Sequence, residues 1–225
     1  MIIKRLDYFI SISIISLFII WAEFSPSSLV DYSLEDGFFE NLSAIFFGVA
    51  SFVFAFAIKT NKQYFDIKIG LGMWATLAWV TLMFIFMGEE ISWGQRIFSI
   101  ATPEALMETN LQQEFNLHNL AIVDNTMGGK YRLFSLMLLC FGLVFPIMKF
   151  FATGKRILHF FAFPAPSLGL GILTVAAYVF GKYYFDLLPM DAASEIREFL
   201  FSVAVLILSI QSVFYPDKAY VIEPN

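Results

Sequence analysis

Cysteine and histidine are both scarce in this chain of 225 residues. It has one cysteine, Cys140, and two histidines, His118 and His159. A single cysteine excludes a disulfide bond and a thiolate metal cluster within one chain. Any metal site in this protein must therefore be built mainly from carboxylate oxygens, with at most a histidine or two.

Charged residues are also few, at 15% of the chain, whereas a typical soluble domain has about 25%. The sequence has neither a run of basic residues that would favour nucleic acid as a partner nor a glycine-rich phosphate-binding loop. Hydrophobic residues make up 59% of the chain and aromatic residues 18%. This composition is typical of an integral membrane protein, so the expected partner is a lipid bilayer and not nucleic acid.

Six apolar stretches are long enough to cross a bilayer, for which a helix needs roughly 17 to 25 residues. We therefore predict an all-α fold, a polytopic bundle of transmembrane helices that forms one domain over residues 1–225. The predicted spans cover residues 8–24, 41–58, 69–87, 133–151, 167–188 and 196–215. The polar segment 97–130 is predicted to be helical, with one helix starting at Thr102-Pro103-Glu104 and another running from Gln112 to Val123.

The distribution of basic residues predicts the orientation of the chain. Six spans place both termini on one side of the membrane. With the termini inside, nine of the 14 lysines and arginines lie on the inner side, and five lie outside. The positive-inside rule favours this orientation. We expect a multipass protein of the cell membrane with cytoplasmic N- and C-termini, and an extracytoplasmic segment 97–130 between spans three and four.

A dense polar motif, Gly88-Glu89-Glu90-Ile91-Ser92-Trp93-Gly94-Gln95-Arg96, directly follows the third span. If the helix continues through it, Glu89, Ser92, Trp93 and Arg96 share one face, and Glu90 points about 100° away. One interpretation is an ordinary interfacial helix end, with Trp93 at the lipid boundary and a solvated Glu–Arg pair. The other is a functional site in which a buried acid is held beside Arg96, with Gln95 as a further polar group.

A second polar cluster lies at residues 110–120. Glu114 and His118 are four residues apart, so on a helix they face the same way. Such a pair can present two metal ligands, or a carboxylate that orients an imidazole for acid–base chemistry. Asn116 and Asn119 add amide groups nearby. The alternative is a structural or solvent-exposed His118.

The sixth span carries a polar stripe. Asp191, Glu195, Glu198, Ser202 and Ser209 fall within roughly 60° of one another on a helix. Lipid cannot satisfy these groups, so we expect the stripe to face the interior of the bundle. Glu198 is the deepest carboxylate, and we predict that it pairs with Arg96 or a metal. In the alternative interpretation, Asp191 and Glu195 are charges at a helix end.

The motif at Glu89–Arg96, followed by Thr102-Pro103-Glu104 and Asn116-Leu117-His118-Asn119, resembles a family of uncharacterised bacterial multipass membrane proteins. The resemblance covers about residues 88–120 and, more loosely, the pattern of spans. It implies that these residues act together, and it brings no established activity with it.

Two functions remain open. The first is a non-catalytic integral membrane protein, such as a sensor, an assembly subunit or a small-solute carrier. The carboxylates of its polar site at the outer face would bind a divalent metal ion, a proton or a membrane protein partner, or would only hold spans three and six together. Glu114, His118 and Glu198 are the predicted metal ligands, with Trp93, Gln95, Asn116, Asn119 and Glu195 as other polar residues of the site. The alternative is a membrane-embedded hydrolase or transferase acting on a lipid or lipid-linked substrate. Its predicted catalytic residues are Glu89, Glu90, Arg96 and His118.

Overall fold

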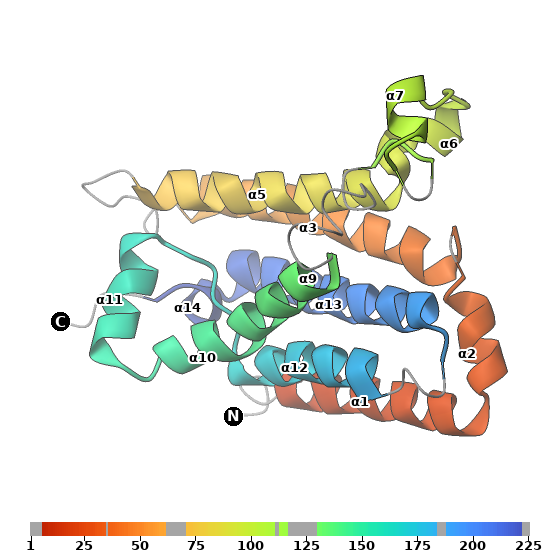
Figure 1. Ribbon diagram of the computed structural model, residues 1–225. Helices are drawn as coiled ribbons and strands as arrows, with labels where there is room; N and C mark the ends of the chain where they lie inside the picture. Colours follow the sequence, from red (N-terminus) through yellow and green to blue (C-terminus); the bar gives the residue numbers. More distant parts are fainter. Residues whose placement is uncertain are drawn as a thin grey trace.

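The computed structural model describes residues 6–34, 36–61, 71–110, 113–116, 130–183 and 188–221. These residues form helices joined by short connections (Figure 1). The helices of the first half are α1 (Leu6–Phe24), α2 (Pro26–Tyr32), α3 (Phe38–Thr60), α5 (Leu71–Glu90), α6 (Gln95–Phe98) and α7 (Glu104–Met107). Those of the second half are α9 (Lys130–Leu139), α10 (Phe145–Met148), α11 (Ala152–Phe160), α12 (Leu168–Tyr183), α13 (Met190–Phe214) and α14 (Pro216–Ala219).

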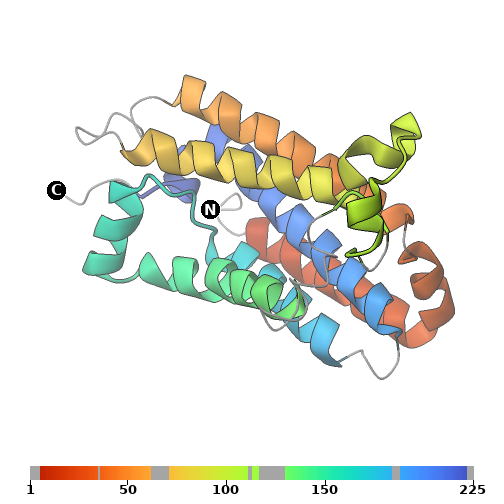
Figure 2. The ribbon, with the colours of Figure 1, turned by 45° about the horizontal axis from the view of Figure 1, so that its top comes forward.

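Helix α13 lies at the centre of the bundle. It packs against α3 on one side and α12 on the other, while α5 packs outside α3 and α1 outside α12 (Figures 1 and 2). Within the most apolar window of each helix, 61% of the residues of α13 are buried inside the protein, compared with 22% in α1. Most side chains of α13 therefore contact other helices, whereas most side chains of α1 are exposed on the outside of the bundle.

Three helices are long and apolar enough to cross a membrane among the residues that the structure describes: α1, α3 and Ala192–Phe214 within α13. A fourth crossing is formed if the bent pair Phe134–Met148 and Ala152–Phe160 counts as one span. These apolar helices fit the predicted integral membrane protein. Helix α5 and the shorter α12 occupy the positions of the predicted third and fifth spans, and the count of six crossings stays a prediction.

Aromatic side chains fill the core where α13 meets its neighbours. The ring of Phe201 contacts those of Phe47 and Phe141, at centroid distances of 6.0 and 5.2 Å. Trp79 of α5 stacks on Phe141 at 5.6 Å with an interplanar angle of 5°. Each such pair contributes roughly 0.5–1.5 kcal/mol beyond burial of its area. Many of the remaining phenylalanines are exposed on the outside of the helices, where lipid would contact them.

The fourth predicted span is not a straight helix. A π-helical turn at Cys140–Val144 separates α9 from α10, and the chain then bends by 116° into α11. Next to the π-helical turn, α12 approaches so closely that a Cβ on Gly142 would lie 3.0 Å from the carbonyl oxygen of Gly171. Because of the 116° bend, helix α11 crosses the end of the bundle and does not continue along it (Figure 1).

Candidate functional site

The polar motif after α5 begins with a break in the helix. Helix α5 ends at Glu90, and Ser92, Trp93 and Gly94 have positive φ angles of 45°, 54° and 78°. Left-handed backbone at non-glycine residues is uncommon and costs energy, so it persists only where surrounding contacts hold it. The prediction that Glu89, Ser92, Trp93 and Arg96 share one helical face is therefore wrong, because the helix does not continue through the motif.

Contacts of the Trp93 indole hold this break in place. Its Nε1 donates a hydrogen bond to Oε1 of Glu89 at 2.8 Å, and its ring lies on Gly88, where an added Cβ would come within 2.9 Å of the ring. Glu89 is only 9% exposed, while Trp93 is 38% exposed. The glycine before the two glutamates thus makes room for the indole, and the indole satisfies a buried carboxylate.

Beyond the break, the motif and the segment 110–116 form a polar cap, which we define as Ser92, Gln95, Thr102, Asn110, Glu114 and Asn116. The Ser92 hydroxyl donates to the Glu114 carboxylate. The Asn116 amide donates to Ser92 Oγ at 3.3 Å and to Glu114 Oε2 at 3.2 Å. Asn110 donates to the Asn116 carbonyl at 2.7 Å. The first two predicted clusters are thus brought into direct contact.

Gln95 joins the two halves of the polar cap from the other side. Its amide nitrogen donates to the Thr102 hydroxyl, and its Oε1 accepts the Phe115 backbone N–H at 2.7 Å. Thr102 in turn donates to the Gln113 carbonyl at 2.7 Å. Thr102 was expected to cap a helix with Pro103 as its first residue, but α7 begins one residue later, at Glu104. The hydroxyl instead closes the polar cap, which projects from the bundle with α6 and α7 (Figure 1).

Beside the polar cap lies a carboxyl cluster, which we define as Glu40 of α3, Glu90 of α5, and Glu195 and Glu198 of α13. The Glu90 and Glu198 side chains make a hydrogen bond, and Glu195 and Glu40 lie close enough to act on Glu90 electrostatically. A hydrogen bond between two carboxyl groups requires a proton on one of them, since an ionised carboxylate only accepts. Burial, followed by the charges of Glu198, Glu195 and Glu40, raises the pKa of the Glu90 carboxyl, which favours a proton on Glu90.

Among the described residues, Arg197 is a positively charged group that lies beside this cluster. It is 4% exposed, and its guanidinium donates to Ser194 Oγ at 3.0 Å. Ser194 donates to Glu198 Oε1 at 3.0 Å, and the direct Arg197–Glu198 distance is 3.9 Å. The guanidinium also lies 5.0 Å from the centre of the Phe134 ring, a cation–π distance. The predicted partner of Glu198 was Arg96 or a metal, and Arg197, one residue away on the same helix, was not among the predicted site residues.

The polar stripe of α13 faces the interior, as predicted for its serines. Ser202 and Ser209 are fully buried and donate to backbone carbonyls three residues earlier in the helix. Glu195 and Glu198 are half-buried in the carboxyl cluster. The side chain of Asp191 lies outside the described residues.

Three predicted site residues also fall outside the described part of the chain: the Arg96 side chain, His118 and Asn119. The predicted helix Gln112–Val123 is described only at 113–116, which are not helical. Within the described residues, no group of three or more histidine, cysteine, aspartate and glutamate side chains is arranged to hold a metal ion. The metal set of Glu114, His118 and Glu198 therefore stays a prediction, as do the catalytic roles of Glu89, Glu90, Arg96 and His118.

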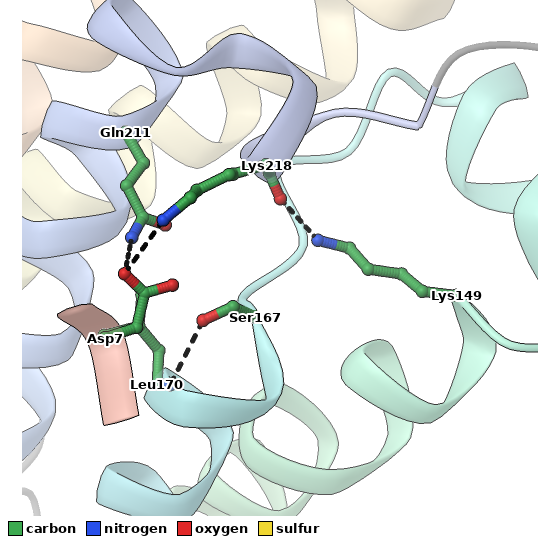
Figure 3. A network of polar contacts seen from close by, with 6 residues as sticks. All are labelled: Asp7, Lys149, Ser167, Leu170, Gln211 and Lys218. Carbon is green, nitrogen blue, oxygen red and sulfur yellow. Dashed lines mark hydrogen bonds and ion pairs between the residues drawn. The ribbon is translucent and has the colours of Figure 1, made fainter. Parts of the chain in front are cut away.

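The opposite end of the bundle holds a second polar network, which we name the terminal clamp (Figure 3). Asp7 of α1 is 4% exposed and accepts hydrogen bonds from Gln211 at 2.9 Å and from the Lys218 ammonium at 3.2 Å. Lys149 donates to the carbonyls of Ala165 and Lys218 at 2.6 and 2.7 Å. The clamp ties α1, α13 and α14 to the turn after α10. Sequence reasoning missed it, because no local pattern links Asp7 to residues 211 and 218.

His159 and Tyr220 lie at the same end of the bundle as the terminal clamp. The Nδ1 atom of His159 lies 3.0 Å from the Val221 carbonyl oxygen, so it contacts the backbone after α14. Burial raises the pKa of the Tyr220 phenol well above its usual range, against a smaller opposing effect of a hydrogen bond with Ser212. Both residues help to fix the chain that follows α13.

Comparison with known proteins identifies no relative. No family model matches the chain, and neither a curated protein nor a solved structure matches it.

Proposed function

We propose that this chain is a multipass integral membrane protein that binds a cation at the carboxyl cluster, on the extracytoplasmic side of the cell membrane. The apolar helices support residence in a bilayer. The positive-inside distribution of lysine and arginine supports cytoplasmic termini, with six crossings and the polar cap outside. The resemblance of residues 88–120 to a bacterial membrane protein family is part of the same proposal.

One observation carries the proposal: four glutamates from three helices lie together, and burial and the charges of its neighbours favour a proton on Glu90. Arg197 lies beside them, with its guanidinium 3.9 Å from the Glu198 carboxylate. Ionisable groups at the end of apolar helices are costly and mark functional sites. Carboxylate oxygens are ligands for protons and for hard divalent ions such as Ca²⁺ and Mg²⁺. The described arrangement favours binding of a proton, and a metal ion would require these glutamates to move together, since no three of them are arranged to hold one.

The proposal is tested by adding Ca²⁺, Mg²⁺, Mn²⁺ or Zn²⁺ to purified protein in detergent and measuring heat and proton release. One metal should bind in a saturable manner and displace about one proton, because metal ligands must be deprotonated. Glu90→Gln and Glu198→Gln should each abolish both signals. Glu104→Gln, on the exposed short helix α7, serves as the matched control and should behave as wild type. Equal binding in all four proteins, or proton binding without any metal effect at any pH, contradicts a metal site.

The role of His118 has its own test. If it is a ligand together with Glu114 and Glu198, His118→Ala should lower the metal content of the purified protein. Unchanged metal content removes His118 from the ligand set while leaving the carboxyl cluster as the binding site.

A second function, lipid hydrolysis or group transfer, is favoured by the Glu90–Glu198 hydrogen bond in particular. Two carboxyl groups in contact, one protonated and one ionised, are the arrangement that enzymes use as a general acid and a general base. In this reading Glu90 acts as the base, with Glu89, Arg96 and His118 as the other catalytic residues. Incubation with a mixed lipid extract, followed by mass spectrometry of released headgroups, should show products that Glu90→Gln does not form. The absence of any product from the wild-type protein contradicts this second function.

A further inference from the structure

A cavity lies far from the carboxyl cluster, between α5, the segment Met137–Met148 and α11. Its volume is about 550 Å³, within the range of roughly 300–1,000 Å³ that small-molecule sites occupy. Ala78 and Leu82 of α5, Met137 of α9 and Ile157 of α11 are among the side chains that line it. The cavity is thus large enough for a ligand and is formed by three separate segments.

The lining of the cavity defines the chemistry of its occupant. The lining side chains are apolar, apart from the thiol of Cys140 and the indole N–H of Trp79. Sites for drug-like or polar ligands have a few placed hydrogen-bonding groups that orient the ligand, and this lining has no such set. The occupant must therefore present hydrocarbon to it. Within a bilayer, the abundant hydrocarbon is the acyl chain of a lipid.

Helix α11 connects the cavity to a charged surface. Because of the 116° bend after α10, it crosses the end of the bundle instead of running along it. Its Ile157, Leu158 and the following Phe161 line the cavity, while Arg156 is exposed and Lys155 is half-buried. A short helix with an apolar side toward hydrocarbon and basic residues on the other side is typical of an element that lies in the membrane interface.

The two basic residues of α11 differ from their neighbour Lys149. The Lys149 ammonium is fully engaged with two backbone carbonyls of the terminal clamp. The side chains of Lys155 and Arg156 make no hydrogen bond or ion pair with any residue that the structure describes. Their charges are available to an anion, and basic groups between membrane helices commonly bind anionic lipid headgroups.

We propose that this cavity binds one acyl chain of an anionic glycerophospholipid, whose phosphate group is held by Lys155 and Arg156 at the membrane surface. Helix α11 contributes both apolar side chains to the cavity and basic residues to the membrane interface. This combination favours a lipid with a negative headgroup over a free fatty chain or a neutral lipid. This lipid site is independent of the proposed cation site at the other end of the bundle.

The test uses the full chain in nanodiscs that contain neutral and anionic phospholipids with identical acyl chains, followed by native mass spectrometry in a mild detergent. One anionic lipid should remain on the wild-type protein, enriched over its share in the nanodisc. Lys155→Gln and Arg156→Gln should each lower this preference roughly fivefold, the effect of about one basic residue at a membrane surface. If the retained neutral and anionic lipids occur in the same ratio as in the nanodisc, the assignment of an anionic headgroup is wrong. If the retained molecule is an isoprenoid or a sterol from the host, the assignment of an acyl chain is wrong.

A second variant tests the cavity itself. Ala78→Phe should fill it and release the lipid, whereas Ala55→Phe, an exposed alanine of α3 outside the cavity, should retain it. The single cysteine provides an independent measurement, because Cys140 lines the cavity. Bound lipid should slow its reaction with a membrane-permeant maleimide, and removal of the lipid should restore the rate. Equal lipid retention in Ala78→Phe and wild type overturns the proposal, as does a maleimide rate that is indifferent to lipid.

Discussion

The acidic residues at the two ends of this bundle have different surroundings. At the terminal clamp, one carboxylate, Asp7, is paired with an ammonium and an amide. At the carboxyl cluster, four glutamates lie together, and Arg197 is 3.9 Å from the Glu198 carboxylate. An acid that is paired with a cation stabilises the fold while the pair is intact, whereas acids that crowd one another raise the free energy of their ionised forms. The clamp and the cluster should therefore respond in opposite ways to the loss of one acid.

The sharpest way to test this contrast is to remove the compensated acid. Asp7→Ala leaves Lys218 and Gln211 without their partner in a region where Asp7 is 4% exposed. Breaking a buried pair from one side typically costs about 3–5 kcal/mol, and because Lys218 is partly exposed we expect a loss of about 3 kcal/mol. Thermal or denaturant unfolding in detergent measures this loss of unfolding free energy.

Two controls accompany this variant. Asp31→Ala, at an exposed aspartate of α2, should leave stability unchanged. The double variant Asp7→Ala/Lys218→Met should be less destabilised than Asp7→Ala, since it removes both charges. Equal losses in the single and double variants would mean that packing of α1, and not the ion pair, carries the effect.

Replacement of an acid in the carboxyl cluster should raise the stability of the protein instead of lowering it. Glu90→Gln keeps the size of the side chain and removes one ionisable group from beside Glu198, so we expect stability to rise by about 1 kcal/mol at neutral pH. The gain should grow as the pH rises, because the wild-type pair must then lose its proton. Unfolding measured from pH 5 to pH 9 checks both statements. A Glu90→Gln protein that is destabilised at every pH would show that the cluster is structural, like the clamp.

The phenol of Tyr220 offers a smaller test at the clamp end. Its raised pKa means that the folded state retains the proton while the unfolded chain releases it above about pH 10, so its contribution to stability is lost as the pH rises past that value. Tyr220→Phe keeps the buried ring, so we expect its stability to lie within about 1 kcal/mol of wild type at pH 8. Above pH 10, wild type should lose stability relative to Tyr220→Phe, because only wild type has a phenol to ionise. A difference that is constant with pH contradicts the burial of the phenol.

The smallest effect on global stability is expected in the polar cap. Asn116→Ala removes hydrogen bonds to Ser92 and Glu114, which belong to the cap itself and not to the helix bundle. We expect global unfolding to change by less than about 0.5 kcal/mol, while amide exchange at residues 110–116 becomes faster. Thr109→Ala, whose hydroxyl bonds only within its own turn, is the control. A cooperative loss of stability in Asn116→Ala would mean that the cap is part of the core.

Much of the helical arrangement could be read from the sequence, because apolar length and the spacing of polar residues are local properties. The buried serines of α13 follow from the stripe at Ser202 and Ser209, since lipid offers no partner for a hydroxyl. The meeting of the motif with Glu114 and Asn116 was expected from their placement on one side of the membrane.

Other features could not be read in this way, because they depend on long-range contacts. The helix break at Ser92 and Trp93 is held by the indole against Glu89 and Gly88, and no residue of the motif signals positive φ except Gly94. The terminal clamp joins residues more than 200 positions apart. Arg197 was counted only as one of the five basic residues of the outer side, although its spacing of three residues from Ser194 would have suggested a shared helical face.

The terminal clamp also sets an order of events during synthesis. Asp7 and Lys218 are separated by 211 positions along the chain, so their contact cannot form until nearly all of the intervening helices have left the ribosome. Until then α1 carries a carboxylate without its final partner, and closing so long a loop is entropically costly unless the helices between have already packed. The ion pair therefore forms late in assembly, and only in a chain whose middle helices have already packed in place.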